Sequence, residues 1–251
     1  WEALGQSYPD ALESMIAVFL NASTADGYNP YRITREGIDW EVMNPRDPWS
    51  NAGYWGDHQI IYLLRLLESA ERFFPSRLSG SLRDETYCYA RIPYEIAGFD
   101  AMLANPRRTI RFNEELHQHL VTRGAELGAD GKLLADADGK TVLVSLAEKL
   151  LVPLLAKLSN LVPDGGIWLN TQRPEWNDAN NALAGWGLSV VTVQYLRRYI
   201  VFLQTILDEA GDKPVSLSTP VAVFAERLTA ILAGSTGTDD AERFKTLEAL
   251  G

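Results

Sequence analysis

Apolar side chains recur at helical spacing along most of this chain. Helices are predicted over residues 10–22, 57–74, 113–126, 145–160, 179–210, 219–233 and from 239 onward. The segments before Phe74 and before Ala210 are apolar on more than one face, which predicts substantially buried helices. Residues 113–126 and 219–233 have one apolar and one polar face, as surface helices do. The pattern therefore indicates an all-α protein.

Polar residues and a proline mark the boundaries of several predicted helices. Asn113 and Thr219 each stand before an apolar periodic segment, where an N-cap residue belongs. Asp57 and Asp178 occupy the same position before the two helices predicted to be buried. Pro153 lies inside the segment 145–160, where it would kink the helix or begin a new one.

Two long stretches lack regular periodicity, residues 23–55 and 76–113. Loops of this length are uncommon in compact domains and are usually functional or disordered. The first stretch is rich in tryptophan and tyrosine, which argues against disorder, so we expect an ordered active-site loop. Asp-Gly-Lys triplets at 130–132 and 138–140 predict turns around, at most, one small β-hairpin.

Alternating buried and amphipathic helices, joined by unequal loops, predict a layered helical barrel. The length suits one large domain or two small ones, and we expect residues 1–251 to form a single (α/α) toroid-type domain or part of one. No repeat of fixed period, such as helical solenoids have, is present in the sequence.

Charge and composition exclude several classes of partner. The net charge of −10 repels phosphate backbones, which argues against nucleic acid. The apolar run 183–207 is long enough to span a bilayer, but Gln194, Arg197 and Arg198 interrupt it. We therefore predict a helix buried in protein and no membrane partner; Arg197 and Arg198 would either extend their charged ends to the surface or pair with acids on a neighbouring helix. No signal peptide is recognised, so we expect a cytoplasmic protein, or a periplasmic or secreted one if a leader has been removed.

The sequence predicts neither a metal site nor a cofactor. Cys88 is the single cysteine, which excludes an intrachain disulfide and is typical of a small buried apolar residue. His117 and His119 are two positions apart, which places their rings on different faces of a helix. No P-loop, dinucleotide fingerprint, nucleophile elbow or zinc signature occurs.

Two helix beginnings share one pattern that could carry chemistry. Trp55-Gly-Asp57 and Trp176-Asn-Asp178 each open a helix predicted to be buried. If both helices belong to the inner ring of one barrel and run the same way, their N-termini meet at one rim. Indole rings then offer apolar faces for sugar rings, while Asn, Gln and Arg side chains can bind hydroxyl groups. This composition favours a neutral polyhydroxylated substrate over a phosphate.

These motifs resemble those of a known superfamily of helical enzymes. Glu175-Trp-Asn-Asp178-Ala-Asn180 is similar to the acidic, tryptophan-containing loop before an inner helix in the six-hairpin (α/α)6 glycosidases. That superfamily includes glucoamylases, trehalase-like enzymes, debranching glucosidases and cellobiose-type phosphorylases, and the phosphorylases' Asp-Trp-Asn-Asp loop is the most similar in spelling. Tyr54-Trp55-Gly-Asp57 resembles the earlier loop that holds the sugar. The superfamily's barrel has more helices than this chain supplies, so we expect further parts of the same polypeptide.

The resemblance implies a glycoside hydrolase that cleaves a glucoside or related oligosaccharide with inversion. Asp178 would donate the proton to the leaving oxygen, Glu175 would compete for that role, and Asp57 would bind the sugar. Asp39 and Glu41, in the aromatic loop, are the candidates for the catalytic base. The remaining candidates for substrate binding are Arg32, Trp40, Trp55, His58, Arg173, Trp176, Asn177 and Asn180.

Three alternatives stay open. Asp57 and Asp178 could serve only as helix caps, because Asp is among the preferred N-cap residues. An inverting disaccharide phosphorylase would use the same acid with inorganic phosphate as nucleophile. A non-catalytic carbohydrate-binding or structural helical domain of a larger protein would keep the aromatic loops without turnover.

Overall fold

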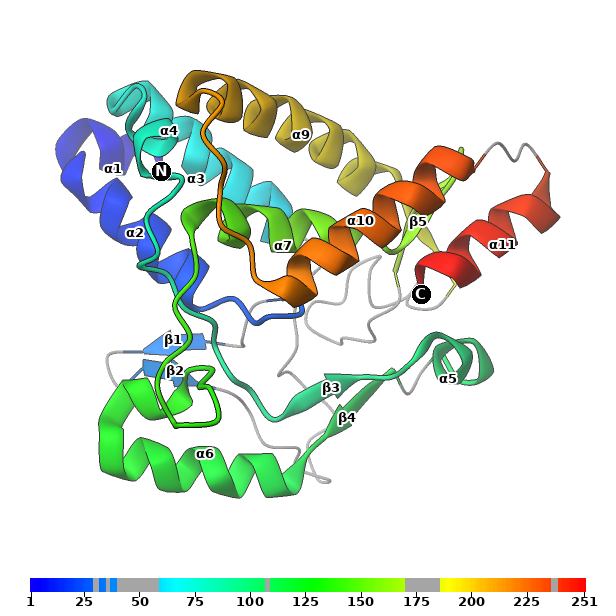
Figure 1. Ribbon diagram of the computed structural model, residues 1–251, viewed down its shortest axis with the longest axis horizontal. Helices are drawn as coiled ribbons and strands as arrows, with labels where there is room; N and C mark the ends of the chain where they lie inside the picture. Colours follow the sequence, from blue (N-terminus) through cyan, green and yellow to red (C-terminus); the bar gives the residue numbers. More distant parts are fainter. Residues whose placement is uncertain (29–31, 35–36, 40–58, 107–108, 170–185, 236–238) are drawn as a thin grey trace.

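The computed structural model of the chain describes residues 1–28, 32–34, 37–39, 59–106, 109–169, 186–235 and 239–251. For residues 32–34 and 37–39 it describes the backbone alone. The described part is mostly helical, as the sequence predicts (Figure 1). The helices are α1 (Glu2–Ser7), α2 (Asp10–Asn21), α3 (Gln59–Phe73), α4 (Arg77–Ser81), α5 (Phe99–Ala104), α6 (Glu114–Leu127), α7 (Leu146–Leu158), α9 (Val190–Ala210), α10 (Thr219–Gly234) and α11 (Asp240–Leu250).

Short antiparallel strands form several small sheets rather than the single hairpin expected. They are β1 (Arg32–Thr34) with β2 (Gly37–Asp39), β3 (Tyr94–Ile96) with β4 (Ile110–Phe112), and β6 (Gly166–Trp168) between β5 (Leu161–Val162) and β7 (Leu188–Ser189). Strands of two or three residues show too little alternation to be recognised in a sequence. Of the two expected turns, the first is a 3₁₀ helix, η1 (Gly128–Lys132). The second is a tight turn in which Asp136 Oδ1 accepts from the backbone N–H groups of Asp138 and Lys140.

Helix α7 is buried along nearly all of its length. Figure 1 shows it between α3 and α10, and it also contacts α9. Every residue of α7 except Leu151 and Leu158 is buried, and the Ser145 hydroxyl caps it by accepting from Glu148 N at 3.1 Å. Pro153 lies inside the helix without ending it. The prediction of one apolar helix over 145–160 is therefore confirmed.

The two helices predicted to be buried on all sides differ from each other. α3 is substantially buried, as predicted. Its residues with no exposed area are Ile60, Leu63, Leu64, Leu66 and Leu67. α9 instead buries one stripe, formed by Thr192, Leu196, Tyr199, Leu203 and Ile206. Because Val191, Val201 and Leu207 are exposed, the prediction that α9 is buried all round was wrong.

Helix α9 also begins later than the sequence suggests. Leu188 and Ser189 are extended and pair with β6, and Ser189 Oγ accepts from Thr192 N at 3.2 Å as the N-cap. The prediction of one continuous helix over residues 179–210 was therefore wrong, whereas the predicted cap at Asp178 lies outside the described residues. The reason is that a neighbouring strand satisfies the backbone groups of residues 188–189, which local periodicity does not reveal.

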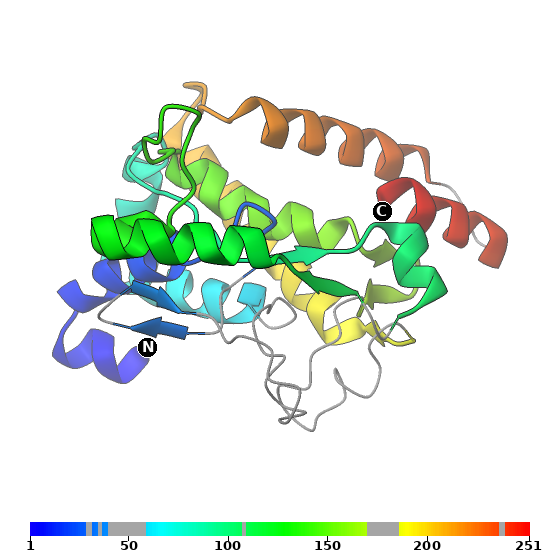
Figure 2. The same ribbon diagram turned by 90° about the horizontal axis from the view of Figure 1, so that it is seen from below.

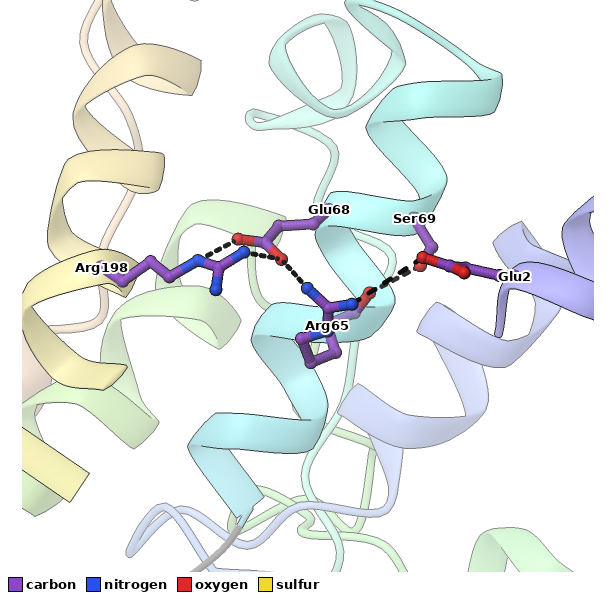
Figure 3. Close-up of polar contacts among 5 residues, drawn as sticks. All are labelled: Glu2, Arg65, Glu68, Ser69 and Arg198. Carbon is purple, nitrogen blue, oxygen red and sulfur yellow. Dashed lines mark hydrogen bonds and ion pairs between the residues drawn. The ribbon is translucent and has the colours of Figure 1, made fainter. Parts of the chain in front are cut away.

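A group of charged side chains joins α9 to α3 and α1 at the surface. Arg198 donates from Nε and Nη2 to the Glu68 carboxylate at 2.6 and 2.8 Å (Figure 3). Arg65 donates to Glu68 at 3.0 Å and lies 3.8 Å from Glu2. The prediction that Arg198 pairs with an acid on a neighbouring helix is confirmed. Solvent-exposed ion pairs of this kind contribute about 0–1 kcal/mol each to the stability of the folded protein. They therefore affect the orientation of the helices more than the stability of their packing.

Helix α6 lies on the side of the molecule opposite α9, and Figure 2 looks at the protein from that side. Asn113 Oδ1 accepts from Leu116 N at 2.9 Å, which confirms the predicted N-cap. Leu120 is buried against Tyr28 and Tyr94 in a second apolar cluster beneath β3 and β4. This cluster holds β3 in place, and β3 forms one wall of the cavity described below.

Arg83 fixes the segment that leads from α9 to α10. Its guanidinium donates to the carbonyl oxygens of Ala210, Gly211 and Pro214 at 3.2 Å each, and also to that of Lys213. The Ser145 hydroxyl donates to Ser216 O at 2.7 Å. These bonds satisfy carbonyl groups at and beyond the end of α9, and they bring the beginning of α10 to α7.

The described helices do not form a closed ring, so the toroid remains a proposal, whereas the mostly helical fold is confirmed. Within the same residues, no helix is both long and apolar enough to cross a bilayer.

Candidate functional site

Most residues predicted to carry chemistry lie outside the described part of the chain. They are Trp40, Glu41, Trp55, Asp57, His58, Arg173, Glu175, Trp176, Asn177, Asp178 and Asn180. Arg32 and Asp39 lie in β1 and β2, where their backbones pair directly. Directly paired residues in an antiparallel ladder have Cα atoms about 4.5–5.5 Å apart. The register therefore brings the backbone of one candidate substrate ligand next to that of a candidate base.

The two helix beginnings do not have the symmetry that the sequence suggests. α3 begins at Gln59, directly after Trp55-Gly-Asp57-His58 in the sequence, so a helix does start beside the first motif. The N-terminus of α9 is at Ser189, well beyond Asp178. The positive end of the α9 dipole therefore acts at Ser189, because the effect is confined to the first turn. Trp55-Gly-Asp57 therefore lies just before α3 in the sequence, whereas Trp176-Asn-Asp178 does not lie just before α9.

A cavity of about 640 Å³ lies between α7, α10, β3 and the loop after α2. Its lining includes Asp26, Tyr28, Glu95, Val152, Asn160 and Phe224. Small-molecule sites commonly have volumes of about 300–1,000 Å³ and combine apolar walls with a few polar groups. The cavity therefore has the size and lining of a site for a small ligand or one end of a larger one.

Gly27 allows the loop after α2 to lie directly on α7. Its φ of 81° is in the left-handed region that favours glycine. A Cβ atom at this position would lie 2.7 Å from Ala156 Cβ and 3.0 Å from Val152 O. Any side chain there would push the loop, with Asp26 and Tyr28, away from α7. Gly27 therefore sets how closely the loop that carries Asp26 and Tyr28 can approach α7.

Glu95 supplies a fixed negative charge at the cavity. Its carboxylate accepts from Asn113 Nδ2 at 2.6 Å and from the Arg111 guanidinium. These hydrogen bonds, that from Asn113 first, lower the pKa of Glu95 below its ordinary value. Glu95 is therefore ionised at neutral pH, where it can accept hydrogen bonds from hydroxyl groups but cannot act as a general acid.

Two charged residues of α7 are buried next to this cavity's walls. Glu148 is 1% exposed and accepts from the Tyr89 hydroxyl and from Ser218 Oγ, both at 2.9 Å, and from Ser218 N at 2.5 Å. Ser218 is the residue before α10, so the carboxylate attaches the beginning of α10 to α7. Burial and the neighbouring Glu148 raise the pKa of Tyr89, which keeps its phenol protonated as a donor.

Lys149 has no exposed area and is enclosed by protein groups. Its Nζ donates to Ser23 O at 3.3 Å and lies 3.7 Å from the centroid of the Tyr89 ring. Burial lowers the pKa of Lys149 well below its ordinary value, although Cys88 and Glu148 act in the opposite direction. Cys88 is buried, as predicted, and burial raises the pKa of its thiol despite the opposing effect of Lys149. The thiol is therefore protonated and unreactive at neutral pH.

We expect Lys149→Met to stabilise the protein by about 1 kcal/mol at neutral pH, because methionine removes a buried amine at similar volume. The pKa of Lys149 is lower in the folded than in the unfolded chain, so the unfolded chain binds more protons between the folded pKa and 10.5. Stability should therefore rise with pH through that window in the wild type. Urea midpoints measured from neutral pH to above 10.5 should show this rise, and it should be reduced in Lys149→Met. The exposed Lys245→Met is the control; a wild-type slope no steeper than that of Lys149→Met would contradict the prediction.

Glu148 and Lys149 are not among the residues predicted from the sequence. The sequence nevertheless indicates that these two side chains are buried. The segment that contains them, residues 146–157, is apolar on nearly all faces. A charged residue in such a segment has little chance of reaching solvent, so it must be paired or enclosed. Lys157, at 3% exposed, follows the same rule: its Nζ lies 4.9 Å from the centroid of the Tyr28 ring.

The described residues contain no group of three or more His, Cys, Asp or Glu side chains arranged to hold a metal ion. Comparison with protein-family models gives no match for this chain, and a search of curated proteins finds no similar sequence. The resemblance to six-hairpin glycosidases therefore rests on the residues of the two motifs and on the helical pattern.

Proposed function

We propose that this chain carries a glycoside-cleaving site of the six-hairpin type and acts on a glucoside or related oligosaccharide. The observation that carries the proposal is the loop Glu175-Trp176-Asn177-Asp178, which combines two carboxylates, an indole and an amide in four residues. The mostly helical fold is compatible with it. A cavity of about 640 Å³ with Tyr28, Phe224 and Glu95 in its lining supports a neutral, hydroxylated ligand.

In this proposal Asp178 protonates the leaving oxygen while a second carboxylate activates water on the opposite face of the sugar. The two carboxyl groups of an inverting enzyme stand about 6.5–9.5 Å apart, which leaves room for that water. Asp39 and Glu41 are the candidates for the base, and the pairing of β1 with β2 sets Asp39 opposite Arg32. Asp57, His58 and Arg173 would bind sugar hydroxyls, together with Asn177 and Asn180.

The test is release of sugar from α- and β-linked glucose disaccharides, measured as free reducing ends. We expect turnover without phosphate, and proton NMR should show the first-formed anomer inverted relative to the substrate. An inverting disaccharide phosphorylase is the second candidate, because the sequence of residues 175–178 resembles the Asp-Trp-Asn-Asp loop of the cellobiose-type phosphorylases. It would release a sugar phosphate and require inorganic phosphate.

The outcome that would overturn the proposal is sugar binding without any cleavage, with or without phosphate. That result would assign the chain to non-catalytic carbohydrate-binding domains. A glycan array that detects no binding at all would exclude this alternative as well.

A further inference from the structure

A pocket between α1, α3 and α9 gathers arginines on the surface of an acidic protein. Its volume is about 250 Å³, and arginines outnumber carboxylates among the residues that line it. These residues are Glu2, Arg65, Glu68, Ser69, Arg72, Phe73 and Arg198. The chain as a whole has a net charge of −10, which repels anions from most of its surface. The lining of this pocket therefore has the opposite charge to the protein as a whole.

Glu68 holds two of the arginines in place. Its carboxylate accepts from Arg198 Nε and Nη2 at 2.6 and 2.8 Å, and from Arg65 Nη1 at 3.0 Å (Figure 3). The Glu68 side chain is 22% exposed, whereas those of Arg65 and Arg198 are 44% and 51% exposed. Each guanidinium group is therefore oriented by a largely covered carboxylate and keeps N–H groups that Glu68 does not use.

Arg72 adds a third guanidinium group to this pocket. It lies one helical turn beyond Glu68 on α3, and its side chain is exposed. It forms no hydrogen bond or ion pair within the part of the chain that the structure describes. Glu2 lies 3.8 Å from Arg65, beyond hydrogen-bond distance, and its side chain is 63% exposed. Around this pocket, N–H donors therefore exceed the acceptors that the described residues provide.

A structural role does not account for the third arginine. The contacts of Glu68 with Arg65 and Arg198 already join α3 to α9. Arg72 contributes nothing to that connection, and its charge repels those of the other two arginines. An anion between the guanidinium groups would replace this repulsion with attraction and would supply the missing acceptors.

The number of arginines indicates which kind of anion fits. A guanidinium fork matches the oxygens of carboxylates and of phosphates. One fork is enough to occupy both oxygens of a carboxylate. A phosphate monoester has three acceptor oxygens and about two negative charges at neutral pH, so it can engage arginines from α3 and α9 at once. Complete small-molecule sites commonly measure about 300–1,000 Å³, so this smaller pocket suits a single phosphoryl group.

We propose that the pocket between α1, α3 and α9 binds a phosphoryl group through Arg65, Arg72 and Arg198. Glu68 is a positioning residue, because it orients Arg65 and Arg198. Inorganic phosphate and the phosphate of a sugar phosphate share this chemistry, and the experiment distinguishes them. None of these residues lines the cavity between α7, α10 and β3, so the inference does not depend on the proposed function.

The experiment is calorimetric titration of the whole chain with inorganic phosphate and with glucose 6-phosphate. In Arg72→Gln, the affinity for both ligands should fall about tenfold, because a charge-assisted hydrogen bond is lost. The Tm of this variant without ligand should stay at the wild-type value, because Arg72 is exposed and has no partner in the described structure. Arg197→Gln is the matched control. It removes an exposed arginine of α9 that does not line the pocket, so affinity should be unchanged.

Glu2→Gln tests the same pocket in the opposite direction. It removes a carboxylate that competes for Arg65 and repels the anion, so affinity should rise by about two- to fivefold. Partial unfolding cannot produce such a gain. Affinity for glucose 6-phosphate above that for inorganic phosphate would support the proposal and assign a sugar phosphate. Affinity no higher than that for inorganic phosphate would support it and assign the free ion.

Three outcomes would overturn the proposal. They are no saturable binding of either ligand by the wild type, unchanged affinity in Arg72→Gln, and equal losses in Arg72→Gln and Arg197→Gln. The last would show attraction by the general charge of α3 and α9 rather than a site. The proposed function would stand in each case, because it is tested with neutral disaccharides.

Discussion

Asp178→Asn should lower kcat for glycoside cleavage by about 10²–10⁴-fold, which is the usual contribution of general acid–base catalysis. Asparagine has nearly the same shape as aspartate but no proton to give to the leaving oxygen. Sugar affinity should therefore change little, since hydrogen bonding at this position is largely kept. The measurement is steady-state kinetics on a natural disaccharide, combined with calorimetric titration of the same sugar.

A substrate with a good leaving group separates loss of the acid from general damage. An aryl glycoside with a nitrophenolate leaving group needs little protonation, so its cleavage should fall much less in Asp178→Asn than cleavage of the disaccharide does. Glu175→Gln is the matched control for the neighbouring carboxylate. If Glu175→Gln shows the leaving-group dependence and Asp178→Asn does not, the roles of the two residues are reversed. Unchanged turnover in both variants would remove this loop from the mechanism.

Glu148→Leu should destabilise the protein by about 3–5 kcal/mol, the usual effect of removing one partner from a buried charged contact. The substitution leaves three donors without an acceptor: the Tyr89 hydroxyl, Ser218 Oγ and Ser218 N. It also leaves Lys149 without the carboxylate that favours its charged form. The measurement is the free energy of unfolding in urea, together with Tm.

Two further variants test whether the hydrogen bonds are responsible. Glu148→Gln keeps the shape and one acceptor oxygen, so its loss of stability should be smaller than that of Glu148→Leu. Glu114→Gln, at an exposed position on α6, should stay within about 0.5 kcal/mol of the wild type. Equal effects of Glu148→Leu and Glu114→Gln would show that the buried carboxylate contributes no more than a surface one.

Glu148 connects stability to the candidate site through α10. Its bonds to Ser218 fix the beginning of α10, and Phe224 of α10 lines the cavity. Arg83 holds the preceding segment from the other side. Weakened attachment of α10 should therefore widen the cavity, and sugar affinity in Glu148→Gln should fall along with stability.

The parts of the fold that could be predicted from sequence are those set by local interactions. The caps at Asn113 and Ser145 act within one helical turn, so the sequence places the beginnings of α6 and α7 correctly. The apolar periodicity of α2, α3 and α7 is local in the same sense. The Trp-x-Asp motifs are also local, and the sequence alone supports the proposed chemistry of Asp178 and Asp57.

Contacts between distant segments decided the rest. Pairing of β7 with β6 moved the beginning of α9 to Ser189, and only packing showed that α9 buries a single stripe. The charges of Glu148 and Lys149 lie in the core because Tyr89 and Ser23, far away in the sequence, provide their partners. A sequence shows that such side chains need partners, since burial without them is costly, but not where those partners are.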